Sequence, residues 1–564
     1  MDQLTGAGHL WKKVKTVEDE DRNHRLEDTR PISAGALAGM LCYGDEIALV
    51  DVREVGQFGL GHMLHAASAP YSRLELTIPG LVPNPQVHLV LIDQADGVAA
   101  RAARRLQALG YDNVQILTGG VDAWAQEGFE LFEGVHVPSK AFGEILAEEN
   151  GTAMIAPADL AMRMADGNAP LLLDIRPYGE YHHQTVPGAI NCPGAELIYR
   201  IADLAGDETT PVVVTCAGRT RGIIATEMLR QSGLKNPVVA LKDGTMGWFK
   251  AGFDLSYGET ARFGGRSPAA MDWSRQAALR MAEDSSVPTL TLEQLNAWRA
   301  DCTRTLYVLD VREPAEYEAG HLKASTSAPG GQLIQATDNW VGVRGARCVL
   351  VDDDSVRATA TAVMLRAMGI DVHVLAGGLD AASGPVERGN PSGPRAPNRA
   401  PRIEARELTQ AIAERPGQVA VVDTGSSAAF CKAHLPGAIW CPRPRLDRLA
   451  LDKGIGLVVV SADDEELADL AAFDLRESVG AEIRGREINV LAGGNSAWME
   501  AGLASEASPD RPADGDRIDF LFWAHDRHQG NLRSIDTYLG WEGTLPDRVR
   551  SDHEHLRTFT NARQ

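Results

Sequence analysis

Short apolar runs recur along the chain, and four of them end in an aspartate. These runs occupy residues 48–51, 171–174, 307–310 and 420–423. A second apolar run follows each of them, at 89–92, 212–215, 349–351 and 458–461, and leads through a turn into an amphipathic stretch such as 223–229. Continuous apolar runs of this length are typical of buried parallel strands, and amphipathic stretches are typical of surface helices.

A third apolar run and a glycine turn close each repeat. The distance from the aspartate to the turn after the second run is 42 residues in the first three repeats and 39 in the fourth. A tryptophan follows the glycine turn in three of the four repeats, at Trp124, Trp248 and Trp498. This agreement predicts four tandem copies of one doubly wound α/β unit, each with a mainly parallel sheet and helices on both faces.

Composition breaks divide the chain into these units. Residues 384–402 are rich in Pro, Gly and Arg, which favours a linker. The predicted organisation is an N-terminal arm at 1–30, unit one at 31–135, unit two at 150–257, unit three at 286–386, the linker at 387–402, unit four at 403–506 and a C-terminal extension at 507–564. The close join between the first two units predicts two packed pairs, one with two and three with four.

Charge and composition narrow the function. The net charge of -22 and pI near 5.1 disfavour nucleic acid as a partner. The chain has no apolar run long enough to span a bilayer, and its first thirty residues lack a signal-peptide core, so we expect a cytoplasmic protein with no membrane partner. Seven cysteines without a CxxC pair disfavour a disulfide framework and a zinc site.

One turn carries residues suited to nucleophilic chemistry. It follows the second strand of unit two, at the sheet edge where doubly wound folds bind ligands, and reads Cys216, Ala217, Gly218, Arg219, Thr220, Arg221 and Gly222. Gly218 is expected to let the backbone curl so that N–H groups bind an anion beside a helix N-terminus. Two arginines add positive charge. We therefore expect the pKa of the Cys216 thiol to be lowered substantially.

The corresponding turn differs in the other three units. It begins with Asp93 in unit one, Asp352 in unit three and Ala462 in unit four, and all three turns are rich in carboxylates. Carboxylates would repel an anionic substrate. Units one, three and four are therefore predicted to be catalytically inactive.

Residues from about 31 to 503 resemble four domains of the rhodanese family. The resemblance rests on the apolar strand followed by Asp-x-Arg, the Cys-x-x-x-x-Arg loop, the closing Gly-Gly…Trp segment, and a histidine eleven residues after the aspartate in three units (His62, His321 and His434). It implies that Cys216 carries sulfane sulfur as a persulfide and that residues 217–222 form the substrate-binding loop.

The same resemblance implies a ping-pong sulfurtransferase with no metal and no organic cofactor. A small anionic sulfur donor, thiosulfate or 3-mercaptopyruvate, would load Cys216, and cyanide, a thiol or a protein cysteine would accept the sulfur. Two positions depart from the family: Gln184-Thr185 replaces the usual Gly-His, and Glu180 stands where two-domain thiosulfate enzymes usually have a substrate-binding arginine. The sequence indicates no particular oligomeric state.

Other polar residues are interpreted as structural. Asp174 and Arg176 are expected to form a salt bridge, the three repeat histidines to be buried with satisfied hydrogen bonds, and His182-His183 to lie at the surface. The other six cysteines are interpreted as core or incidental residues. His525 and His528 in the extension have the spacing of metal ligands, but a helical cap that packs its aromatics on a neighbour is favoured.

Two other functions compete with the main one. A cysteine phosphatase or arsenate reductase also uses a thiolate in an anion loop, but a Cys-x5-Arg loop needs arginine where this chain has Gly222. A persulfide carrier or scaffold keeps Cys216 as a relay, with the inactive units as docking surfaces for a protein partner. Turnover with small acceptors distinguishes the carrier from the sulfurtransferase, because a carrier would load one sulfur and stop.

Overall fold

The computed structural model describes residues 30–381, 386–391, 393–477, 485–527 and 530–563. Within them, four sheets share one strand order, which confirms the predicted α/β class. The orders are β1-β5-β4-β2-β3, β6-β10-β9-β7-β8, β11-β17-β16-β12-β14 and β19-β23-β22-β20-β21. Neighbouring strands within each of these paths run parallel.

The first two units have matching elements in the same order. Unit one contains β1 (Arg30–Ile32), α2 (Ala34–Cys42), β2 (Ile47–Asp51), α3 (Val55–Leu60), β3 (Ala67–Ser68), η2 (Tyr71–Arg73), α4 (Leu74–Leu81), β4 (His88–Ile92), α5 (Val98–Ala108), β5 (Val114–Leu117) and α6 (Gly120–Gln126). Helix α7 (Val137–Asn150) leads into unit two, with β6 (Met154–Ile155), α8 (Pro157–Ala165), β7 (Leu171–Asp174), α9 (Tyr178–His183), β8 (Ile190–Asn191), α10 (Glu196–Ala205), β9 (Val212–Thr215), α11 (Thr220–Gln231), β10 (Val238–Leu241) and α12 (Gly244–Lys250).

The last two units repeat the pattern with small additions. Helix α13 (Pro268–Asp284) leads into unit three, with β11 (Thr289–Leu290), α14 (Leu292–Ala300), β12 (Leu306–Asp310), α15 (Pro314–Ala319), β13 (His321–Leu322), β14 (Thr326–Ser327), α16 (Gly330–Gln335), η3 (Thr337–Asn339), β15 (Val343–Arg344), β16 (Arg347–Val351), α17 (Val356–Ala367), β17 (Asp371–Leu375), α18 (Gly378–Ala381) and β18 (Val386–Glu387). Unit four contains β19 (Arg402–Ile403), α19 (Ala405–Glu414), β20 (Val419–Asp423), α20 (Ser427–Lys432), β21 (Ile439–Trp440), η4 (Arg443–Arg448), β22 (Leu457–Ser461), α21 (Glu465–Glu477), β23 (Glu487–Leu491) and α22 (Gly494–Glu500).

The central strands form because β-branched residues are buried on both faces of each sheet. All four residues of β9, Val-Val-Val-Thr, are buried, as are all five of β22. Alternating polar residues are absent from these two strands, because helices cover both sheet faces. A parallel strand followed by a helix places the connecting turn at the carboxyl edge of the sheet. Cys216 follows β9 at this edge.

A glycine at the start of the last helix locks this turn in every unit. Gly120, Gly244, Gly378 and Gly494 have φ between 54° and 62°, and a Cβ on each would lie 2.3 to 2.7 Å from a carbonyl oxygen of the turn after the second strand. That carbonyl belongs to Asp93, Cys216, Asp352 and Ala462 respectively, and it accepts a hydrogen bond from the residue after the glycine. Only glycine combines this φ with this close approach. The repeated glycines therefore fix the backbone of the turn.

The units do not pack in the predicted pairs. Unit two packs on unit three through α10, α13 and α17, where a Cβ on Gly194 would lie 3.2 Å from the Cα of Gly331. The fully buried Arg357 of unit three forms an ion pair with Glu196 of unit two. Strand β15 of unit three joins the sheet of unit one, antiparallel to β2. The expectation of one–two and three–four pairs is therefore wrong.

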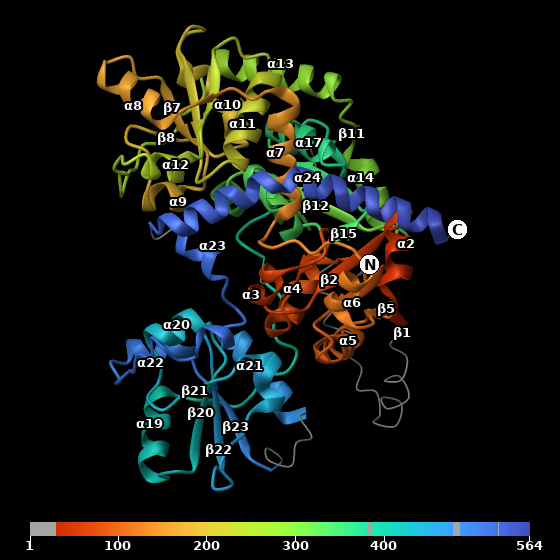
Figure 1. Ribbon diagram of the computed structural model, residues 1–564, viewed down its shortest axis with the longest axis vertical. Helices are drawn as coiled ribbons and strands as arrows, with labels where there is room; N and C mark the ends of the chain where they lie inside the picture. The colour runs from red at the N-terminus through yellow and green to blue at the C-terminus, as the bar shows by residue number, and fades with distance from the viewer. Residues whose placement is uncertain (1–29, 382–385, 392, 478–484, 528–529, 564) are drawn as a thin grey trace.

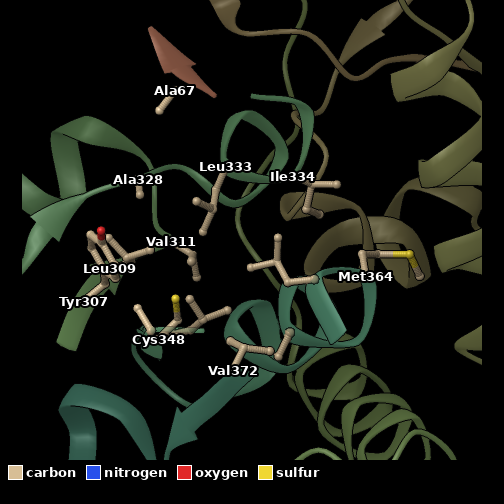
Figure 2. Close-up of a cluster of buried hydrophobic side chains, with 14 of the residues drawn as sticks. Ala67, Tyr307, Leu309, Val311, Ala328, Leu333, Ile334, Cys348, Met364 and Val372 are labelled. Atoms are coloured by element: carbon tan, nitrogen blue, oxygen red, sulfur yellow. The ribbon is translucent and has the colours of Figure 1, made fainter. Parts of the chain in front are cut away.

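Unit four contacts unit one (Figure 1). Arg443 of η4 is 1% exposed and pairs with Glu75 of α4 at 2.6 Å and with Asp474 of α21 at 2.9 Å. A separate apolar cluster runs through units one, two and three. Figure 2 shows part of this cluster, with Ala67 of unit one and Cys348, Leu333 and Met364 of unit three. The buried Cys348 is a core residue, as expected.

The C-terminal extension is helical and crosses two units. After η5 (Asp514–Asp516), helix α23 (Phe522–Asp526) leads into the long α24 (Leu532–Arg563), which packs along α7 and reaches α2 of unit one (Figure 1). Ring contacts join Trp523, Tyr538 and Trp541. The expected aromatic helical cap is confirmed, and it lies over the turn that contains Cys216. His528 lies outside the described residues.

Candidate active site

The Cys216 thiol lies in a ring of backbone groups between β9 and α11. The N–H of Gly222 donates to Sγ at 3.3 Å, and the N–H of Gly218 also donates to the sulfur. The carbonyl oxygen of Arg219 lies 3.9 Å from Sγ. Cys216 is only 2% exposed. Two N–H donors at the start of a helix form a site for negative charge on sulfur.

Close packing explains the glycine at position 218. Gly218 does not have a left-handed φ, so backbone conformation alone does not require glycine here. A Cβ there would lie 2.7 Å from Cε of Met246 and 3.5 Å from Oε2 of Glu542. The neighbouring Ala217 anchors the loop, because its carbonyl accepts hydrogen bonds from the N–H of Met246 and the hydroxyl of Thr245.

Both loop arginines form salt bridges with carboxylates. Arg219 pairs with Glu144 of α7 at 2.6 Å and with Asp243 at 3.1 Å. Arg221 pairs with Glu180 of α9 at 2.8 Å. The positive charge that the sequence predicts here is therefore offset by carboxylates from other segments. Glu180, which stands where an arginine is usual in two-domain thiosulfate enzymes, is the partner that neutralises Arg221.

Burial raises the pKa of the Cys216 thiol. Removal of water from the sulfur is the largest cause, and it outweighs the opposing effects of Arg221 and of the N–H groups of Gly222 and Gly218. The carboxylate of Glu542 raises the pKa further. The expected lowering of this pKa is therefore wrong. The sequence could not show that other parts of the chain would cover the thiol.

The rate at which an uncharged haloacetamide alkylates Cys216 is expected to keep rising with pH to above about pH 9, because only the thiolate reacts. Peptide mapping by mass spectrometry measures the rate at this cysteine alone. The same peptide in denatured protein is the control, since a free thiol titrates near about 8.5. A plateau below about pH 8 in the folded protein would contradict the raised pKa.

Helix α24 covers the loop with residues that sequence reasoning missed. Glu542 accepts hydrogen bonds from Tyr538 at 2.7 Å and from the loop residue Thr220 at 3.2 Å. Lys140 of α7 donates to the Tyr538 hydroxyl at 2.6 Å and lies 3.5 Å from Glu542. The aromatic content of the extension indicated that it packs on a neighbour. Nothing in the sequence indicated which neighbour it contacts, and no motif marked Lys140 as a residue near Cys216.

In units one and three, a carboxylate fills the space that the thiol occupies in unit two. Asp93 accepts from the N–H of Ala99, and Asp352 from the N–H of Ala358. Both donors stand six residues after the acid, as Gly222 stands six residues after Cys216. The N–H groups that reach sulfur in unit two are therefore already satisfied by the chain's own carboxylate. This arrangement supports the prediction that these units are inactive.

The residues interpreted as structural have structural contacts. Arg176 forms a salt bridge with Asp174 at 2.6 Å, and Thr185 donates to the same carboxylate at 2.7 Å in place of the usual histidine. The repeat histidines are buried and each ring nitrogen Nδ1 lies within hydrogen-bond distance of a backbone carbonyl: His62, His321 and His434. His182 and His183 are exposed. Within the described residues, no cluster of His, Cys, Asp and Glu is suited to a metal ion.

Comparison with known proteins identifies the family of three of the four units. The rhodanese-like domain matches this chain three times, at residues 33–127, 156–251 and 291–384. The chain belongs to the rhodanese family. The matched segments fall in the first three rhodanese units, and unit four has the same strand order. Across the described segments, no helix is both long and apolar enough to cross a membrane.

Two relatives are named as sulfurtransferases. The crystal structure of a thiosulfate sulfurtransferase from Pseudomonas aeruginosa is 39% identical, covers 93% of this chain and 99% of its own, and superposes with a TM-score of 0.84. The 3-mercaptopyruvate sulfurtransferase of Escherichia coli is 27% identical over 198 residues, which is 30% of this chain and 68% of that protein. The first likeness extends over nearly all of this rhodanese chain.

Proposed function

We propose that this rhodanese moves sulfane sulfur from a small anionic donor to a thiophilic acceptor through a persulfide on Cys216. The observation that carries the proposal is the pair of N–H donors, from Gly218 and Gly222, directed at Sγ. Among the corresponding turns of the four units, only that of unit two has a thiol at this position. The two relatives named above support thiosulfate and 3-mercaptopyruvate as the donors to test first.

The proposed reaction has two balanced steps. The Cys216 thiolate attacks the outer sulfur of thiosulfate, the S–S bond of the donor breaks, and its electron pair leaves with sulfite. With 3-mercaptopyruvate the C–S bond breaks, and the carbon keeps the electron pair and takes up a proton to give pyruvate. An acceptor then attacks the outer sulfur of the persulfide, and the Cys216 thiolate is restored. The proposal requires no metal or organic cofactor.

The loop residues have separate proposed roles. The N–H groups of Gly218 and Gly222 stabilise negative charge on the sulfur during both steps. Arg219, Arg221 and Thr220 hold the loop in place through Glu144, Glu180 and Glu542, while the carbonyl of Ala217 ties it to the closing turn. The burial of Cys216 favours a small acceptor, cyanide or a small thiol, over a protein cysteine.

Intact-mass spectrometry tests the proposal. The protein is incubated with thiosulfate or with 3-mercaptopyruvate, and the Cys216→Ser variant is the control. We expect the wild-type chain to gain one sulfur atom that cyanide removes, and the variant to gain none. An equal gain in the variant would place the sulfur elsewhere. The absence of any gain with both donors would overturn the persulfide assignment.

A further inference from the structure

Glu542 is a buried residue, and one of its two carboxylate oxygens accepts no hydrogen bond from the described residues. Its side chain is 1% exposed. Oε1 accepts hydrogen bonds from Tyr538 and Thr220, whereas Oε2 has no hydrogen-bond partner among the described residues. Oε2 faces the loop, since a Cβ on Gly218 would lie 3.5 Å from it. A sulfur donor that reaches Cys216 past Gly218 would therefore meet a carboxylate oxygen.

The charges around the Cys216 loop balance. The cations are Arg219, Arg221, Lys140 and Arg527, and the carboxylates are Glu144, Asp243, Glu180 and Glu542. Arg527 of the loop between α23 and α24 lies with its guanidinium 4.0 Å from the centroid of the Tyr538 ring. With all eight groups ionised, this set has no net charge. Without Glu542 it would have one net positive charge.

We propose that Glu542 determines donor specificity, and that it makes the Cys216 site favour a monoanionic sulfur donor over a dianionic one. This inference rests on the function proposed above. The repulsion between Glu542 and a bound donor grows in proportion to the donor's charge, and it is poorly screened because the carboxylate is buried. Thiosulfate carries two negative charges and 3-mercaptopyruvate carries one, so the dianion is disfavoured.

Donor kinetics of charge variants test this inference. In Glu542→Gln, kcat/KM for thiosulfate is expected to rise at least about tenfold, mainly through a lower KM, while kcat/KM for 3-mercaptopyruvate rises by about threefold or less. Lys140→Gln removes a cation from the same cluster and is expected to change the ratio of the two values in the opposite direction. Asp547→Asn, which removes an exposed carboxylate from the same helix, is the matched control and should leave the ratio unchanged.

The opposite signs separate specificity from a structural role, because simple damage to the site would lower both values in both variants. An unchanged ratio in Glu542→Gln, or a shift in the same direction in the two variants, would overturn the inference. Should Glu542→Gln not fold, the fall in the thiosulfate to mercaptopyruvate ratio in Lys140→Gln decides alone. Intact-mass loading is measured on every variant, so that failure of the inference with Cys216 still loaded is distinguished from failure of the persulfide function.

Discussion

Turnover by the Cys216→Ser variant is expected to fall at least about a thousandfold with either donor, because a serine hydroxyl at this position remains protonated and cannot form a persulfide. The hydroxyl is smaller than the thiol and still accepts the N–H of Gly222, so the fold is expected to be retained. Steady-state formation of thiocyanate from cyanide measures the effect, and the thermal unfolding midpoint confirms that the variant is folded.

Cys302→Ser provides the matched control for this variant. Cys302 is an exposed cysteine in unit three, remote in sequence from the loop, and the same substitution there should leave turnover within about twofold of wild type. Retention of most activity in Cys216→Ser would show that sulfur transfer proceeds without this thiol. Loss of activity in both variants would point to general damage by serine and not to the chemistry of Cys216.

The Arg443→Met variant is expected to lose about 3 to 5 kcal/mol of the free energy of unfolding at the contact between units one and four. Arg443 is 1% exposed and pairs with Glu75, also 1% exposed, and with Asp474. Its removal leaves Glu75 buried with Arg105, at 3.8 Å, as its remaining ion-pair partner in the described contacts. The midpoint of denaturant unfolding, followed by near-UV circular dichroism, measures the loss.

Arg448→Met is the control for the charge change. Arg448 ends the same η4 helix but is exposed, so its replacement should shift stability by less than about 0.5 kcal/mol. The triple variant Arg443→Met, Glu75→Leu, Asp474→Leu should recover part of the loss, because replacing buried ion-pair partners together with apolar residues is often tolerated and Arg105 keeps Glu477 as a partner. Equal stability of Arg443→Met and wild type would show that the network does not hold unit four to unit one.

Local spacing is sufficient to predict the repeated architecture. An apolar run that ends in Asp174, a second run that ends before Cys216 and a glycine turn at Gly244 are features of short segments, and each segment folds in the same way in all four units. The loop residues follow from the same pattern, because the turn after a parallel strand lies at the carboxyl edge of its sheet. The position of Cys216 and of its loop can therefore be predicted from the sequence.

The glycines of the turns show what local sequence cannot predict. The closing glycines need a positive φ and have no room for a Cβ, which agrees with their place in a turn. Gly218 also stands in a turn, but the reason for glycine there is different: the side chain of Met246 in α12 leaves no room for a Cβ. The sequence shows that position 218 is a glycine, but only the packing explains why no larger residue fits there.

The arrangement of the units and the electrostatics of the site depend on contacts between distant segments. Thr220 and Glu542 are 322 residues apart in sequence, and Arg443 and Glu75 are 368 apart. Apolar periodicity indicates that a face is buried but does not identify the surface that covers it. For this reason the sequence could not predict that unit two packs on unit three.

Spacing within about fifty residues is enough to predict the α/β repeat, the carboxylate-rich turns of three units and the position of Cys216. The pKa of that thiol depends on contacts between segments that are distant in the sequence. Burial removes water from the thiol, and Glu144, Asp243 and Glu180 neutralise the two loop arginines. A pKa depends on every charge and every solvent molecule within several ångströms, and such neighbours are set by the packing of the whole chain.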